Sequence, residues 1–451
     1  MRLFVLLAAL AASFQLVSGA SAQAPARLVL QHATLIDAAS PVARPGMSVV
    51  IEGERILRVD HDEQVDPADY PDARVLDADG LYLLPGLVET HAHLGTSPTP
   101  AWSEAMLDRY LQGGITTVRD MAGDTRYLSD LRRRILIGEV SGPELYFSAL
   151  MAGPSFFDDP RTASSSAGET PGDVPWMQAI DAGADMPLAV AMARGTGARG
   201  IKIYANLPAA EVARIGEEAR RQDVLVWSHG TIAPALPMDA VEAGVNVLSH
   251  ACMLVSHVSS LKPDAYPARP DTDFSAFGTD YSGYDDLFAA MREHGTMLDA
   301  NLRLYAEADR RRAANPDNPP RMRCPLSYAA GIVAAAHEAG VPITTGTDGA
   351  SPPDARLPAL YDELELLAEA AGLSPHDVIT AATFNGALAL GLRGEIGLIS
   401  PGYQADLIVL TEDPLADISH MRSIREVISN GRLVTREGWR PAQALVDGEQ
   451  Y

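Results

Sequence analysis

Hydrophobic and polar residues follow two different patterns along this chain. Short β-branched or alternating runs, separated by Pro, Gly and Asp, occupy residues 28–37, 47–59 and 73–84. The same pattern returns at 403–410 and at 424–435, where Asn430-Gly431 is a hairpin-type turn. We expect the first group to form a small antiparallel sheet. Because neither group is large enough to bury a two-layer core alone, we expect both to join in one discontinuous β-sandwich.

Strand-like and helical runs alternate between these two groups. Amphipathic helices are predicted at 208–222, 327–339 and 357–371, and another begins after Ser374. Eight apolar runs with strand character lie at 84–89, 115–119, 145–148, 200–204, 224–228, 245–249, 296–300 and 343–347. This alternation is typical of an α/β fold with a parallel sheet, and eight units predict a (β/α)8 TIM barrel. We expect the barrel to span residues 85–390 and the β-sandwich to combine residues 23–84 with 391–451.

The first 22 residues have the pattern of an export signal. Arg2 precedes an apolar stretch that continues to about Val17, and Ala20-Ser21-Ala22 matches an A-x-A cleavage site. The apolar stretch is shorter than the ~20 residues that a membrane-spanning helix needs. We therefore expect residues 1–22 to be removed, leaving an exported protein, periplasmic or secreted, that is not held in the membrane.

Composition narrows the classes of partner and of metal site. The 451 residues are 47% hydrophobic and 21% charged, as in a globular protein, and the formal net charge of −24 disfavours nucleic acid and anionic membranes as partners. The only cysteines are Cys252 and Cys324, so a metal would have to be held by His and carboxylate. Export would permit a disulfide between them, but two free, buried cysteines are the favoured expectation.

Metal-ligating residue types stand at the ends of five predicted strands. The run LPGLVETHAHL carries two histidines with one residue between them, and side chains at i and i+2 of a strand point to the same face. Active sites of barrels are assembled from the carboxyl ends of different strands. The residues that would meet there are His91, His93, Lys202, His229, His250 and Asp348.

These motifs resemble the amidohydrolase superfamily, in the branch of imidazolonepropionase-like proteins and metal-dependent dipeptidases. The resemblance extends from about Leu28 to Val434. It rests on LPGLVETHAHL, TTVRDMAG, the strand-end histidines 229 and 250, TGTDG, TFNGALALGL and GEIGLISPGYQADLIVL. It implies a (β/α)8 barrel flanked by a β-sandwich, with divalent metal ions, usually zinc.

The resemblance also implies a role for each ligand. His91, His93 and Asp348 would bind a buried metal, and His229 and His250 a more exposed one. Lys202 would bridge two divalent ions, because family members with lysine on the fourth strand carry it as a carbamate formed with CO2. An unmodified lysine cannot ligate a cation, which leaves a mononuclear site of the deaminase or imidazolonepropionase kind as the alternative.

The expected activity follows from such a site. A metal-bridging hydroxide would attack the carbonyl carbon of a small-molecule amide or peptide, of the dipeptide or N-acyl amino acid class, and Asp348 would deliver the proton to the leaving group. A lactonase or phosphoester hydrolase, or a catalytically inactive binding protein, stays an alternative. The oligomeric state, a homo-oligomer included, is left open.

Substrate contacts are less well defined by the sequence. The chain has no histidine between His93 and His229, so Tyr204, His257 and Tyr305 are the candidates to polarise the substrate carbonyl. Two arginines near strand ends, Arg119 and Arg303, could pair with a substrate carboxylate. The long loops 154–175 and 254–283 would leave the barrel mouth, and we expect them to act as lids.

Overall fold

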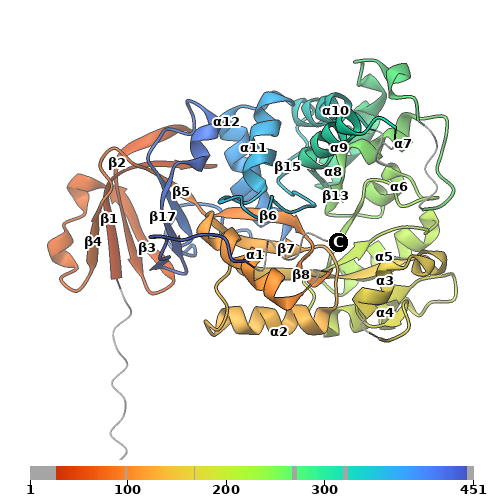
Figure 1. Cartoon of the computed structure of the whole chain (residues 1–451), viewed down its shortest axis with the longest axis horizontal. Coiled ribbons are helices and arrows are strands. Elements are labelled where there is room, and N and C mark those ends of the chain that lie inside the picture. The colour runs from red at the N-terminus through yellow and green to blue at the C-terminus, as the bar shows by residue number, and fades with distance from the viewer. Residues whose placement is uncertain (1–26, 97–98, 167, 267–271, 318–323, 444–451) are drawn as a thin grey trace, which may run out of the picture.

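The computed structural model describes residues 27–96, 99–166, 168–266, 272–317 and 324–443. Its strands form two sheets, one parallel and central to a barrel, the other smaller and beside it (Figure 1). The predicted signal segment, residues 1–22, lies outside the described residues. Among the residues described, no helix combines the length and the apolar character needed to cross a lipid bilayer.

The larger sheet confirms the predicted barrel. Neighbouring strands pair in parallel from β6 to β15, and a hydrogen bond from Thr90 N to Thr345 O (2.9 Å) joins the last strand to the first. A short antiparallel extension, β9 (Asp173–Val174) and β10 (Met177–Ala179), follows the third strand. The barrel strands are β6 (Leu87–Ala92), β7 (Ile115–Asp120), β8 (Glu144–Ala152), β11 (Gly200–Ile203), β12 (Leu225–His229), β13 (Val247–Ser249), β14 (Met297–Asp299) and β15 (Ile343–Thr344).

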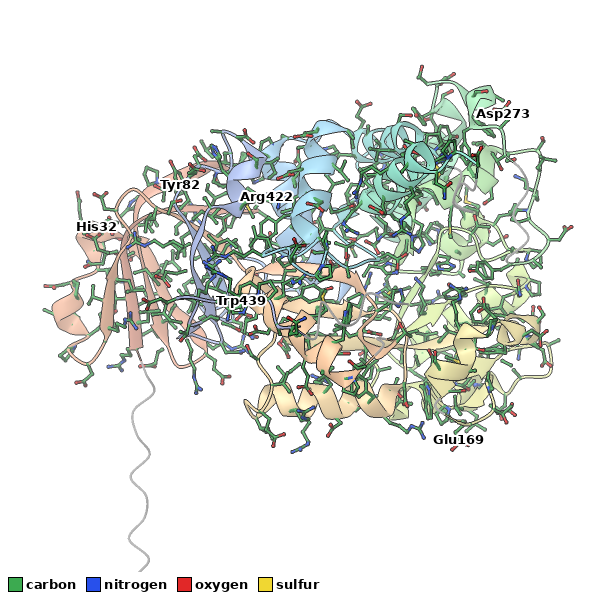
Figure 2. All side chains as sticks on the ribbon, in the orientation of Figure 1. His32, Tyr82, Glu169, Asp273, Arg422 and Trp439 are labelled. Carbon is green, nitrogen blue, oxygen red and sulfur yellow. A yellow bond between two sulfur atoms is a disulfide. The ribbon has the colours of Figure 1, made fainter. Side chains whose placement is uncertain are left out.

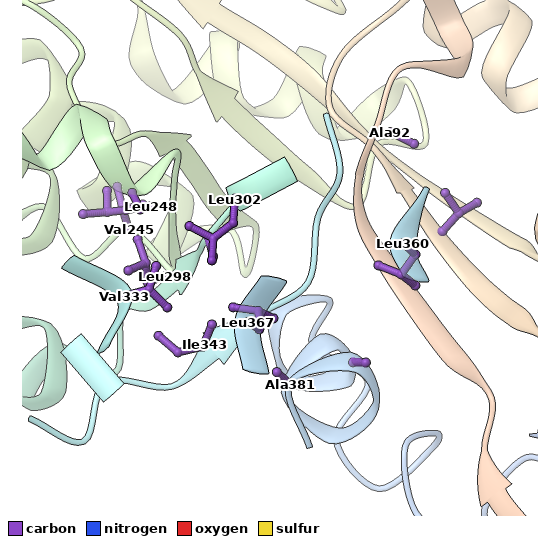
Figure 3. Packing of buried hydrophobic residues seen from close by; sticks show 14 of the residues in the cluster. Ala92, Val245, Leu248, Leu298, Leu302, Val333, Ile343, Leu360, Leu367 and Ala381 are labelled. Atoms are coloured by element: carbon purple, nitrogen blue, oxygen red, sulfur yellow. The ribbon is translucent and has the colours of Figure 1, made fainter. Parts of the chain in front are cut away.

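Helices surround this barrel and share one core with it. Leu248 and Leu298 on the strands pack with Val333 and Leu367 on the helices (Figure 3), and all four are fully buried. The predicted helix after Ser374 is confirmed, since the Ser374 hydroxyl accepts a hydrogen bond from Asp377 N. The helices are α1 (Pro100–Gln112), α2 (Thr125–Leu136), α3 (Arg161–Ser166), α4 (Met186–Gly195), α5 (Ala209–Arg221), α6 (Pro237–Glu242), α7 (Val255–Val258), α8 (Asp285–His294), α9 (Leu302–Ala314), α10 (Leu326–Glu338), α11 (Leu360–Glu369), α12 (Pro375–Thr380) and α13 (Gly386–Ala389).

The smaller sheet combines both ends of the chain, as predicted. Its order is β18-β17-β16-β5-β1-β2-β3, with β4 also beside β1, and Figure 1 shows β17 next to the N-terminal strands. The sheet is mixed rather than antiparallel, because β4 and β5 both run parallel to β1. The strands are β1 (Arg27–Asp37), β2 (Ser40–Glu52), β3 (Arg55–His61), β4 (Arg74–Asp77), β5 (Tyr82–Pro85), β16 (Leu407–Leu410), β17 (Ile424–Ser429) and β18 (Arg432–Leu433).

Alternating residues of β16 join the two sheets. Leu407 and Val409 pack in the core of the small sheet, whereas Ile408 and Leu410 face the barrel core, as the two-residue period of a strand requires. The strand predicted at 84–89 is divided at Gly86, where a side chain would collide with Thr116, so residues 84 and 85 belong to the small sheet. On the surface, Arg422 (labelled in Figure 2) donates to Glu365 of α11 and fastens the C-terminal segment to the barrel.

Candidate metal centre

Six side chains of metal-ligating type lie at or just beyond the carboxyl ends of five barrel strands. His91 lies on β6 and His93 just after it, Lys202 lies on β11 and His229 ends β12, while His250 and Asp348 follow β13 and β15. The local sequence explains this placement, because each buried apolar strand ends in a polar residue where the chain leaves the barrel. The sequence prediction and the strand positions therefore agree for all six residues.

Asp348 lies at the centre of the cluster. Its Oδ1 atom is 3.1 Å from His93 Nε2 and 3.9 Å from His91 Nε2, and its Oδ2 atom is 3.9 Å from His250 Nδ1. One ligand atom each from His91, His250 and Asp348 fit within 4.8 Å of one another. A single cation could therefore be reached by two imidazoles, from two different strand ends, and by the carboxylate.

His229 and Lys202 extend the cluster. The ring of His229 lies 5.0 Å from that of His250, which in turn lies 5.0 Å from that of His91. Lys202 is 1% exposed, and burial, with the nearby charge of Arg119, lowers the pKa of its amine to about 7. A buried lysine in this state is neutral for much of the time near pH 7.

The backbone at the mouth is held in an unusual conformation. Three non-glycine residues at strand ends, His250, Asn301 and Asp348, have φ values of 72°, 54° and 45°. Hydrogen bonds hold them: His250 N donates to Asp299 O and to Asn301 Oδ1, and Asp348 N donates to His91 O, each at 2.9 Å. Left-handed conformations at non-glycine residues are costly and are concentrated at functional sites. This strain supports a functional rather than a purely structural cluster.

The donor atoms fit a divalent metal. Lys202 Nζ and His250 Nδ1 are buried without a hydrogen-bond partner, although such groups are normally paired. Burial lowers the pKa of His91 to about 4, which keeps its imidazole neutral, as ligation requires. Burial alone would raise the pKa of Asp348, but His91 and His93 together hold it well below its usual value. Neutral imidazoles and a carboxylate are ligands that zinc prefers, whereas the Lys202 amine could join them only after modification.

Tyr204 remains beside this cluster. Its ring lies 4.1 Å from the ring of His229 and 4.5 Å from Phe156, which comes from the loop after β8. The loop after β13 contributes Tyr266, whose hydroxyl accepts a hydrogen bond from Arg161 at 2.6 Å. The two long loops therefore meet next to Tyr204, although their role as lids stays a prediction.

Two predicted substrate residues are buried elsewhere. Arg119 is fully buried inside the barrel, where it lies over the Trp227 ring at 4.6 Å and donates from Nε to Thr90 O. It cannot meet a substrate carboxylate at the mouth, so that expectation is corrected. Tyr305 is 1% exposed and its hydroxyl accepts from Cys252 N at 3.1 Å, so it supports a loop rather than a substrate.

The two other predicted substrate residues are engaged by carboxylates. The His257 ring bonds Asp286 at 2.8 Å and stacks on Tyr284, an arrangement that fixes α7 against α8. Arg303 donates to Ala350 O, just after Asp348, and lies 3.4 Å from the Asp362 carboxylate. His257 lies within one of the mouth loops and Arg303 beside another, and both side chains are already held by these contacts.

Several functional features were not identified from the sequence. Asp299, at the end of β14, places its Oδ2 atom 2.8 Å from His91 Nδ1, within hydrogen-bond distance. Burial would raise its pKa, but His91 and Arg119 lower it to about 2. Cys252 and Cys324 form a disulfide, contrary to the favoured expectation that both are free. An acidic residue near the end of the seventh predicted strand, 296–300, was the only signal for Asp299.

The barrel, its small β domain and the cluster of His, Lys and Asp at the carboxyl mouth define a barrel protein with a candidate metal site. The Amidohydrolase family model matches residues 82–434, and the chain belongs to the amidohydrolase family. This confirms the resemblance seen in the sequence. Family membership supports a hydrolase that acts on amide or related carbon–nitrogen bonds of small molecules.

Individual relatives agree with this assignment. Ochratoxinase from Aspergillus niger is 27% identical over 411 residues, which cover 80% of this chain and 77% of the relative. The crystal structure of A. niger ochratoxinase has a TM-score of 0.70 at 23% identity, covering 95% of this chain and 99% of that one. A Xaa-Pro dipeptidase with bound methionine has a TM-score of 0.69 at 21% identity, covering 91% and 100%. At these identities the two structures support the fold alone.

Proposed function

We propose that this protein is an exported, binuclear metal-dependent amidohydrolase that cleaves an amide or peptide bond in a dipeptide or an N-acyl amino acid. The observation that carries the proposal is the cluster of His91, His250 and Asp348, whose ligand atoms lie within 4.8 Å of one another, together with a buried Lys202 amine that has no hydrogen-bond partner and feels the charge of Asp348. Relatives named ochratoxinase and Xaa-Pro dipeptidase are consistent with amide substrates.

Lys202 would complete the binuclear site as a carbamate. Its neutral amine would attack CO2 through the nitrogen lone pair and release one N–H proton, which leaves an anionic N-carboxylate in place of the amine. Lys202 and Lys262 are the only lysines among the 35 basic residues Lys and Arg. Arginine cannot be deprotonated in proteins, so an arginine at residue 202 could not form the carbamate, whereas a lysine can.

Asp348 would transfer the proton during the reaction. When bound, a pair of divalent cations supplies Lewis acidity, which generates a nucleophile from water near neutral pH and polarises the substrate carbonyl. The ionised Asp348 carboxylate would accept the proton from the nucleophile and return it to the leaving amine. Tyr204, beside His229, is the candidate to contact the substrate carbonyl or a polar group next to it.

Export is supported by two independent features. The first 22 residues match a signal peptide, and the disulfide between Cys252 and Cys324 is of the kind that persists in oxidising compartments. The N-terminal sequence of protein recovered from an exporting host tests the proposal. We expect it to begin at Gln23, whereas an intact Met1 in the exported fraction would refute the cleavage site.

Metal and CO2 binding test the site directly. After purification with zinc and bicarbonate, we expect two metal ions per chain and a carbamate signal in 13C NMR under 13CO2. Lys202→Ala should lose both the signal and the second ion, while Lys262→Ala is the matched control, because the Lys262 amine donates to the carbonyls of Ser256 and His257 in α7. Two ions bound normally by Lys202→Ala would overturn the binuclear proposal.

A substrate panel tests the reaction. Dipeptides, N-acyl amino acids, lactones and phosphotriesters would be compared with the metal-loaded protein. Fastest turnover of an amide supports the proposal. Preference for lactones or phosphotriesters would assign the same site to a different bond, and no turnover of any class with two metals bound would favour a binding protein.

A further inference from the structure

Asp299 makes the most extensive set of contacts beneath the candidate metal centre. It is fully buried. Its Oδ2 atom lies 2.8 Å from His91 Nδ1 and accepts a hydrogen bond from the Ser249 hydroxyl at 3.1 Å. The Thr90 hydroxyl lies 3.2 Å from Oδ1. These three partners come from β6 and β13, on either side of β14 and β15 in the barrel, so the carboxylate is fixed from several directions.

A positive charge inside the barrel accompanies this carboxylate. Arg119 NH2 lies 3.6 Å from Asp299 Oδ2, and both side chains are fully buried. The guanidinium is held in place by Thr90 O and by the Trp227 ring. An arginine that is always protonated favours the ionised form of its neighbour. The hydroxyls of Ser249 and Thr90 and the Arg119 guanidinium all present donors to Asp299, so this geometry makes the carboxylate an acceptor on both oxygens.

We propose that Asp299 is a positioning residue that fixes the tautomer of His91. A carboxylate cannot donate a hydrogen bond, so Nδ1 of His91 must carry the proton and Nε2 must carry the lone pair. Nε2 is the atom that faces Asp348, at 3.9 Å. The inference rests on the proposed metal role of His91. It states that Asp299 fixes the ligating tautomer of this imidazole already in the metal-free protein.

The contact between His91 and Asp299 needs a glycine at residue 346. A Cβ atom at Gly346 would lie 2.6 Å from His91 Cβ and would overlap the Asp299 carboxylate. The carbonyl of Gly346 also accepts a hydrogen bond from Asn301 Nδ2 at 2.8 Å, which holds the segment after β15 against the segment after β14. The contact between His91 and Asp299 thus depends on the absence of a side chain at residue 346, just beyond β15.

The tautomer can be measured without metal and without substrate. Long-range 1H–15N correlation spectra of the metal-free protein with 15N-histidine should show His91 protonated at Nδ1, the signal being assigned by its loss in His91→Asn. In Asp299→Asn we expect a mixture of tautomers, since an amide can donate as well as accept. The affinity for zinc, measured by competition with a chelator, should fall by about 10–100-fold.

Glu363→Gln is the matched control. Glu363 is another fully buried carboxylate near the same strand ends, but it accepts from the backbone N–H groups of Leu302 and Arg303 rather than from a histidine. It should leave the His91 spectrum and the zinc affinity within about twofold of wild type. His91 protonated at Nε2 in the wild-type protein would overturn the inference, even if Asp299→Asn failed to fold. A wild-type protein with the expected tautomer that binds no metal would instead refute only the proposed function.

Discussion

Replacing Gly346 by alanine is the sharpest steric test of the candidate metal centre. The new methyl group would lie 2.6 Å from His91 Cβ and nearer still to Asp299 Oδ1, about 1 Å closer than ordinary contact. Asp299 is anchored by His91, Ser249 and Thr90, so it has little freedom to retreat. Overpacking of this kind lowers the free energy of unfolding by about 1–3 kcal/mol. Displacement of a carboxylate that supports a metal ligand lowers the metal affinity by about 10–100-fold.

Two measurements separate the two effects. Urea unfolding of the metal-free protein gives the loss of stability, and chelator competition gives the zinc affinity. Gly195→Ala is the control, because a methyl group at the end of α4 meets nothing within 4 Å and should leave both values near wild type. A Gly346→Ala protein with unchanged zinc affinity would refute the reasoning, since the contact would then tolerate displacement.

Three further predictions concern other parts of the molecule. Asp348→Asn should keep its metal content but lose at least ~10²-fold in kcat, and wild-type turnover would refute its role in proton transfer. Replacing Cys252 and Cys324 by serine should lower the free energy of unfolding in urea by roughly 4 kcal/mol for a sequence separation of 72; an unchanged unfolding midpoint would contradict this. Burial raises the pKa of Asp406 to about 7, so the stability that depends on its protonated form is present below about pH 4 and is lost as pH rises through 7. Asp406→Asn should remove this part of the pH dependence of the unfolding midpoint, and an unchanged profile would refute it.

The order of strands and the main ligand candidates could be predicted because they follow from local patterns. His229, His250 and Asp348 each close a short apolar run, and parallel barrel strands bring such ends together. Burial inside the barrel was not predictable in the same way. Every residue of β7 is buried, so no alternation shows that Arg119 points inward rather than to the mouth.

Contacts between strands that are far apart in the sequence also could not be predicted. Asp299 lies within a predicted strand, but its contact with His91 follows only when β14 is placed beside β13 and β15. The division of the first predicted strand at Gly86 depends on how closely Thr116 approaches, which no local pattern records. The disulfide joins segments whose distance is set by the packed helices. These features depend on tertiary proximity.

The position of β16 in the small sheet has a consequence for synthesis. β5 pairs with β16, yet more than 300 residues separate Pro85 from Leu407. At about 5–20 residues per second, the ribosome needs roughly 15–65 s to supply the missing partner. Until then one edge of β5 has no strand to pair with, and open edges are liable to aggregate. The first part of the chain to emerge is therefore among the last to be completed, and a nascent chain stopped before residue 407 would keep that edge exposed.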